Sequence, residues 1–138
     1  MLKILFSIFF TSIVLNADLV HDARQHYLNG NKVKAMELLT QSCDNGRISG
    51  CNTLGMMYLR GDGVRQNKRK ASKLLYKACN GSEYIMNTDA CFTLGVMHYR
   101  GEGVQLDKIE AKKLFGKACD GGHSDGCTNY KILLNEGY

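Results

Sequence analysis

The 138-residue sequence contains no proline, so no proline ring ends a helix, kinks one or stiffens a linker anywhere in the chain. Its long apolar run, residues 4–15, falls short of the roughly 20 residues that a helix needs to cross a bilayer. No low-complexity segment or linker divides the sequence. Together these absences favour one continuous helical domain that does not span a membrane once its first residues are removed.

The N-terminus has the pattern of a secretory signal peptide. Lys3 supplies a positive charge, the apolar run follows, and Leu15-Asn16-Ala17 ends it with a small residue. We therefore predict a signal peptide over residues 1–17 and export to the periplasm or out of the cell. Residues 18–138 remain, which is enough for one domain with a thin core.

The sequence also lacks a strong excess of one charge, since it has 18 basic and 13 acidic residues. Many basic residues are dispersed along two helical segments, where we interpret them as solvated faces. They are Lys68, Arg69, Lys70, Lys73, Lys77, Lys108, Lys112, Lys113 and Lys117. No nucleic-acid partner is expected.

One stretch occurs twice: LGMMYLRGDGV at residues 54–64 returns as LGVMHYRGEGV at residues 94–104. Each copy is followed by a segment that ends in Lys-Ala-Cys, at Cys79 and at Cys119. The first segment of each copy has the composition of a helix that stops at Gly61 or Gly101, because glycine adopts the left-handed conformation at a helix end at least cost. The repeated unit is therefore a helix, a glycine turn and a second helix.

The second helix of each unit carries a narrow apolar stripe at helical spacing. The stripe consists of Ala71, Leu74, Leu75 and Ala78, and then of Ala111, Leu114, Phe115 and Ala118. A single hairpin cannot bury this stripe, whereas stacked hairpins can. We predict an all-α, disulfide-stapled solenoid of helix-turn-helix repeats, and we expect a monomer. Its parts are a divergent first repeat over 18–50, a second over 51–90, a third over 91–126 and a capping helix over 127–138.

Six cysteines fall in neighbouring pairs, and an even count in a small exported chain indicates disulfides. Each pair joins the end of one second helix to the start of the next first helix, which predicts Cys43–Cys51, Cys79–Cys91 and Cys119–Cys127. A zinc site is disfavoured because the paired cysteines are separated by seven or eleven residues, while zinc ligands are usually separated by two to four. No metal and no cofactor are expected.

Two local features lead to further predictions. Gly55 and Gly95 stand inside helices, where glycine costs roughly 1 kcal/mol relative to alanine, so we expect each to allow the second helix of its hairpin to approach closely. The expected partners are alanines, Ala71 or Ala78 for Gly55 and Ala111 or Ala118 for Gly95. The connection between Cys79 and Cys91 is longer than its equivalents. It carries Tyr84, Ile85 and Met86 as a candidate contact site, and Thr88 or Asp89 is expected to cap the next helix.

A solenoid presents a concave surface lined by its first helices, and this groove is the candidate binding site. Positions that differ between the otherwise matched copies are expected to line it. They are Asn52, Met56 and Leu59 in one copy, Phe92, Val96 and Tyr99 in the next, and Asn129 in the cap. The predicted ligand is an extended peptide or a peptidoglycan fragment, or the surface of a protein partner.

The repeated motif resembles the Sel-like repeat, a relative of the tetratricopeptide repeat. The residues that carry the resemblance are Leu54, Gly55, Tyr58, Gly61, Gly63, Val64, Ala71 and Ala78, and the next copy matches except for His98 in the tyrosine place. The paired cysteines are similar to those of the Helicobacter cysteine-rich protein family. Members of that family are regarded as penicillin-binding proteins with slow β-lactamase activity, so the resemblance implies a β-lactam-binding or hydrolysing role.

The residues themselves do not supply such a catalytic site. No Ser-x-x-Lys follows residue 17, no Lys-Thr-Gly is present, and Ser124-Asp125-Gly126 only approximates the second serine-enzyme motif. The histidines His21, His26, His98 and His123 are scattered, and His98 is interpreted as a packed side chain. Catalytic residues stay unassigned. Two hypotheses remain open: a slow β-lactam-binding or hydrolysing protein, and a non-catalytic peptide-binding or protein-interaction module.

Overall fold

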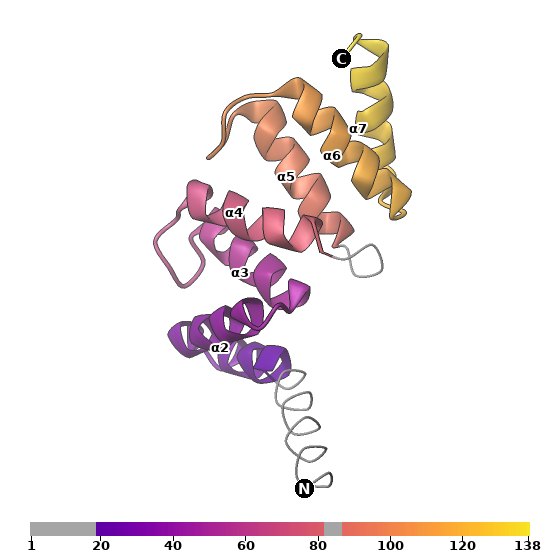
Figure 1. Cartoon of the computed structure of the whole chain (residues 1–138). Helices are drawn as coiled ribbons and strands as arrows, with labels where there is room; N and C mark the ends of the chain where they lie inside the picture. The colour runs from indigo at the N-terminus through magenta and orange to yellow at the C-terminus, as the bar shows by residue number, and fades with distance from the viewer. Residues whose placement is uncertain (1–18, 82–86) are drawn as a thin grey trace, which may run out of the picture.

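A computed structural model describes residues 19–81 and 87–138, and all regular structure in these ranges is helical. A helix over residues 19–28 is followed by α2 (Lys32–Asp44), α3 (Ile48–Arg60), α4 (Lys68–Cys79), α5 (Thr88–Arg100), α6 (Lys108–Asp120) and α7 (Ser124–Asn135). From α2 onward, extensive contacts join helices that are consecutive in the sequence, and Figure 1 shows them stacked in chain order towards α7. The predicted all-α repeat fold is confirmed. The proposed signal peptide and the apolar residues Tyr84, Ile85 and Met86 lie outside the described residues.

Glycine ends the first helix of both matched copies, as predicted. Gly61 and Gly101 have φ angles of 70° and 68°, and their N–H groups donate to the carbonyls of Met57 and Met97. The expected cap of α5 was wrong by one residue, because Asn87 is the residue outside the helix, and its side chain accepts from the N–H of Ala90. Thr88 and Asp89 instead form the first turn of α5.

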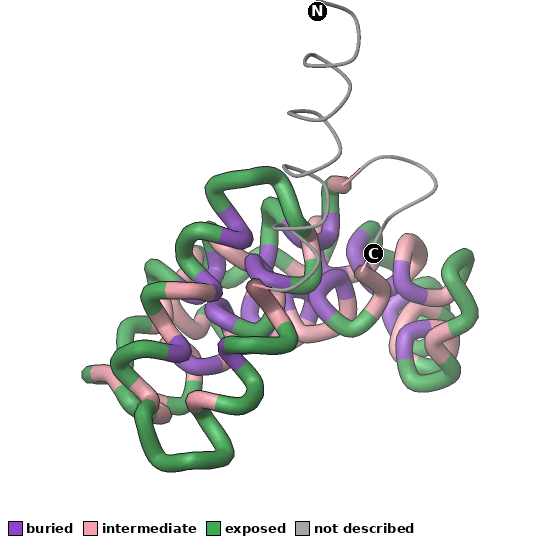
Figure 2. Tube along the Cα trace, turned by 90° about the horizontal axis from the view of Figure 1, so that it is seen from below, coloured by how far each residue is buried: buried purple, intermediate pink, exposed green. Residues whose placement is uncertain are grey.

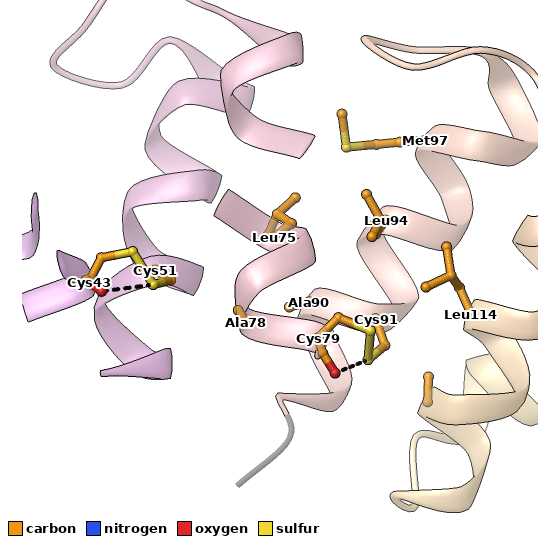
Figure 3. Packing of buried hydrophobic residues seen from close by; sticks show 11 residues of the cluster. Cys43, Cys51, Leu75, Ala78, Cys79, Ala90, Cys91, Leu94, Met97 and Leu114 are labelled. Atoms are coloured by element: carbon orange, nitrogen blue, oxygen red, sulfur yellow. Dashed lines mark hydrogen bonds between the residues drawn. A yellow bond between two sulfur atoms is a disulfide. The ribbon is translucent and has the colours of Figure 1, made fainter. Parts of the chain in front are cut away.

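The core is a series of apolar clusters between successive helices, and Figure 2 shows the buried positions running through the middle of the stack. The predicted stripe of the second helices is buried: Ala71, Leu75, Ala111 and Leu114 are all at most 1% exposed. In Figure 3, Leu75, Leu94 and Leu114 meet from α4, α5 and α6 in the largest cluster. Each helix therefore buries its apolar face against its neighbours in the stack.

Three disulfides join the pairs expected from the repeat: Cys43–Cys51, Cys79–Cys91 and Cys119–Cys127, with Cα atoms 4.4–4.6 Å apart. Such short spacing requires small residues beside the cysteines. A Cβ atom at Gly50 would lie 2.5 Å from Ser42 Oγ, and one at Gly126 would lie 2.8 Å from Ala118 Cβ. The small residues before the cysteines thus let the helices approach closely enough to be bridged.

The glycines inside α3 and α5 do meet the second helix of their own hairpins, but through other partners than the expected alanines. A Cβ atom at Gly55 would lie 3.0 Å from Leu75 Cγ, and one at Gly95 would lie 2.8 Å from the ring of Phe115. Leu75 and Phe115 belong to the same stripes as the alanines, and their longer side chains reach over the glycines. The close-packing interpretation holds, with Leu75 and Phe115 as the residues in contact.

Candidate functional site

Each glycine turn docks on the second helix of the preceding repeat. A Cβ atom at Gly63 would lie 2.6 Å from Lys32 Cβ, and one at Gly103 would lie 2.5 Å from the backbone of Lys68. These lysines begin α2 and α4, so the turns bring acidic side chains against the starts of those helices. The turns therefore connect repeats as well as reversing the chain within one.

An ion pair accompanies each of these contacts between repeats. Lys32 Nζ lies 2.5 Å from Asp62 Oδ1, and Lys68 Nζ lies 2.8 Å from Glu102 Oε2. Lys108, which begins α6, continues the series at 3.7 Å from Glu136 Oε2. The interpretation of Lys68 and Lys108 as solvated faces was therefore wrong, because the stack brings a carboxylate from the next repeat to each of them.

The two turns use their acidic residue differently. Both oxygens of Asp62 accept hydrogen bonds, one from Lys32 Nζ and the other from Tyr27 Oη at 2.5 Å. These two bonds lower the pKa of Asp62 below its usual range, and the bond to Asp62 raises the pKa of Tyr27. The Oε2 atom of Glu102 accepts a hydrogen bond from Lys68 Nζ, and Arg100 Nη1 lies 3.9 Å from its Oε1 atom.

The predicted groove residues of α3 divide between two environments. Met56 and Leu59 are half-buried and pack against the cluster that α3 shares with α4, α5 and α6. Met56 also borders a cavity on the side of the first hairpin. The Oδ1 atom of Asn52 is buried and has no hydrogen-bond partner among the described residues.

In α5, the matched residues are largely committed to packing. Phe92 stacks on His123 with ring centroids 4.4 Å apart, and it lies 5.6 Å from the ring of Phe115. Val96 packs against the apolar cluster of Ala111, Phe115 and Leu133 from α6 and α7. Tyr99 remains 40% exposed, with Lys108 Nζ 5.5 Å from its ring centre.

The capping helix contributes a half-buried Asn129 to the proposed groove. The predicted groove residues therefore do not form one continuous open site, since Phe92 and Val96 fill the space beside α7. Phe92 and Val96 are half-buried because of their contacts with His123, Phe115 and the cluster beside α7, which a repeat alignment does not reveal. Tyr99 and Met56 are the members of the set best placed to meet a ligand.

A cavity of about 610 Å³ lies between the helix over residues 19–28, α2 and α3. Its apolar wall includes Ala23, Leu39 and Met57, which belong to the core cluster between the first hairpin and α3. Its polar residues are His21, Arg24, Tyr27, Thr53, Arg60 and Asp62. Sequence reasoning missed this site except for Met56. The sequence carried no local signal for it, because the hydrogen bond between Tyr27 and Asp62 joins residues from different repeats.

Two serine hydroxyls are buried among the described residues. The buried hydroxyl of Ser72 donates to the backbone carbonyl of Arg69, and the buried hydroxyl of Ser42 has no partner among the described residues, so neither is paired with a base. No group of three or more potential metal ligands occurs within 19–81 and 87–138. None of the helices described is long and apolar enough to cross a membrane. The arrangement is suited to binding by apolar contact and charge.

Comparison with known protein families finds the Sel1 repeat at residues 23–46, 48–82 and 88–123. These segments cover the first hairpin in part and the second and third hairpins almost completely. No curated protein sequence matches the chain.

Solved structures with the same arrangement include three bacterial proteins. A Sel1 repeat protein from Oxalobacter formigenes is 24% identical with a TM-score of 0.75, over 86% of this chain and 47% of its own. A protective antigen of uropathogenic Escherichia coli with an SLR fold is 28% identical with a TM-score of 0.71, over 80% of this chain and 24% of its own. Helicobacter pylori cysteine rich protein B is 27% identical with a TM-score of 0.67, over 86% of this chain and 91% of its own. The chain thus spans less than half of the first two proteins.

Proposed function

Since the chain belongs to the Sel1 repeat family, we propose that it is a non-catalytic interaction module that binds an extended peptide or a protein partner along its first helices. Repeats of this family typically mediate protein interactions. The observation that carries the proposal is the 610 Å³ cavity between the first helix and α3, with apolar walls and a charged rim. Pockets of this size that combine apolar walls with a few polar groups are typical of binding sites.

We further propose that the module acts outside the cytoplasm. Three disulfides in so small a chain are typical of exported proteins, and the Helicobacter pylori neighbour is itself named a cysteine rich protein. The signal peptide over residues 1–17 stays a prediction, as does the choice between periplasm and release. N-terminal sequencing of the protein recovered separately from the periplasmic fraction and from the culture medium checks both the cleavage after Ala17 and the compartment.

The binding proposal is tested by screening the disulfide-bonded protein against a peptide library and soluble peptidoglycan fragments. Met56→Ala truncates the predicted groove residue that lines the cavity, and Tyr76→Ala is its control because Tyr76 is 57% exposed on α4, a second helix. We expect Met56→Ala to weaken the binding of the selected ligands, whereas Tyr76→Ala leaves it unchanged. Equal binding to both variants and to the parent protein would exclude the cavity as the site, and a screen without ligands would overturn the function.

The β-lactam-binding role with slow hydrolysis remains the alternative, and it rests on the family resemblance. Its test is the turnover of nitrocefin and penicillin by metal-free protein with all three disulfides intact. The β-lactam role requires hydrolysis above the buffer rate or a covalent penicilloyl adduct in the mass spectrum. If neither is found, this role is abandoned and the interaction module stands alone.

A further inference from the structure

The cavity between the first hairpin and α3 has two arginines on its rim, Arg24 and Arg60, and neither forms an ion pair with a described residue. Both oxygens of Asp62 accept hydrogen bonds, from Lys32 and from Tyr27, and Arg60 lies near this carboxylate without forming an ion pair with it.

The matched turn of the next repeat shows the alternative arrangement. There Arg100 stands in the place of Arg60, and Nη1 of Arg100 lies 3.9 Å from Glu102. Among the hydrogen bonds of the described residues, Glu102 accepts one from Lys68 and none from a tyrosine. The same arginine position is therefore paired in one repeat and available in the other.

The charge around the cavity favours an anion. Asp62 is the acidic side chain that lines it, and the Lys32 ammonium at 2.5 Å offsets that charge. Neither guanidinium group forms an ion pair with a described residue, and their planar forks of N–H donors match the geometry of a carboxylate. A free inorganic anion would leave the apolar wall of Leu39 and Met56 unused.

We propose that this cavity binds an acidic segment of an extended peptide, with a Glu or Asp carboxylate held by Arg24 and Arg60 and a neighbouring apolar side chain against Leu39 and Met56. This inference rests on the proposed peptide-binding function and adds the ligand class and its position in the stack. It places the specificity for an acidic peptide between α3 and the first hairpin, the repeat that departs most from the shared motif.

The test uses two pools of dye-labelled decapeptides with amidated C-termini. One pool carries Leu and Glu at randomised positions among Ser and Gly, and the other has Gln in place of every Glu. Fluorescence anisotropy on the disulfide-bonded protein should show at least about tenfold tighter binding of the Glu pool, as expected for hydrogen bonds to a charged group. Raising the salt concentration should reduce this preference.

The decisive variant is Arg24→Gln combined with Arg60→Gln, and its control is Arg69→Gln combined with Arg100→Gln, which removes the same charge elsewhere. All four side chains are exposed, so both variants should fold. We expect the first variant to reduce the Glu preference below about twofold with the Gln pool unaffected, and the control to keep it.

Each other outcome overturns a defined statement. A Glu preference that survives in the Arg24 and Arg60 variant overturns the arginine site. A preference that falls equally in the control also overturns it, because the effect is then one of net charge. Equal binding of the two pools to the parent protein overturns the acidic-peptide inference and leaves the interaction module in place. Binding of neither pool, together with an empty library screen, overturns both.

Discussion

The second hairpin (α3 and α4) and the third (α5 and α6) repeat one motif, yet they use the space beside their first helices in opposite ways. In the third hairpin, Phe92 fills that space by stacking on His123 of the capping region and packing near Phe115. In the second, the matched position is Asn52, and the cavity lies on the side of α3 that faces the first hairpin. Three of the α3 residues that line the cavity, Thr53, Met57 and Arg60, recur in the third hairpin as Thr93, Met97 and Arg100, so the cavity depends on how the first hairpin packs against α3.

Removal of the disulfide at the junction between the two hairpins should lower the free energy of unfolding the most. Cys79 and Cys91 are 1% and 0% exposed in the largest cluster, whereas Cys119 and Cys127 are half-buried. Replacing Cys79 and Cys91 by alanine should lower the free energy of unfolding by about 3 kcal/mol, because the bridge both closes the longer loop and lies in the core. Guanidinium denaturation measures the loss. The same change at Cys119 and Cys127 should cost less, and the reverse order would contradict the central role of the buried bridge.

The hairpins should next differ in their tolerance of a side chain at the internal glycine. Gly95→Leu should destabilise by about 3 kcal/mol and Gly55→Leu by about 1–2 kcal/mol, since a Cβ atom approaches Phe115 more closely than it approaches Leu75. Urea melts of the two variants, with the corresponding alanine variants as controls, give the comparison. A higher midpoint for either leucine variant would show that the glycine is tolerated rather than required for packing.

The matched residues Phe92 and Asn52 should also respond differently to truncation. Phe92→Ala should cost about 2 kcal/mol, because it removes the stack on His123 and the contact with Phe115. Asn52→Ala should leave stability unchanged or raise it, because it removes a buried Oδ1 atom that has no described hydrogen-bond partner. Thermal unfolding by circular dichroism distinguishes these two results. Equal losses would mean that Asn52 is as deeply committed to packing as Phe92.

The smallest expected effect concerns the ion pairs between repeats and their response to pH. Hydrogen bonds from Lys32 and Tyr27 lower the pKa of Asp62, and the bond from Lys68 lowers the pKa of Glu102. A carboxyl with a lowered pKa in the folded state stabilises it above the unfolded value of about 4, and this contribution disappears as the pH falls through the folded pKa. Asp62→Asn and Glu102→Gln should therefore be less stable than the parent protein at pH 7.

Urea denaturation at a series of pH values between 7 and 2 checks the direction of this effect. The difference between each variant and the parent should begin to shrink near pH 4 and close at lower pH. Because these groups lie at the surface, the differences should be small and should weaken in high salt. A difference that widens on acidification would contradict the assigned role of the two carboxylates.

The local residues were sufficient to predict the repeated helices, the glycine ends of α3 and α5, and the bridges. The stop at Gly61 depends on a left-handed conformation of that one residue, and the apolar stripe through Leu75 depends on helical periodicity. The disulfide pairs follow from repeat spacing because the two cysteines of each pair lie at the ends of consecutive helices. These features depend on interactions within one repeat or on the period itself.

The cavity and its free arginine were decided only by the stacked structure. Tyr27 reaches Asp62 across 35 residues, and this contact depends on how the first hairpin docks on the next turn. Asp62 thus accepts from Lys32 and Tyr27 and forms no ion pair with Arg60, while Arg100 in the same motif is paired with Glu102. The sequence by itself determined the repeated unit because its forces are local, whereas the candidate site needed the tertiary structure because its charges come from different repeats and compete for one carboxylate.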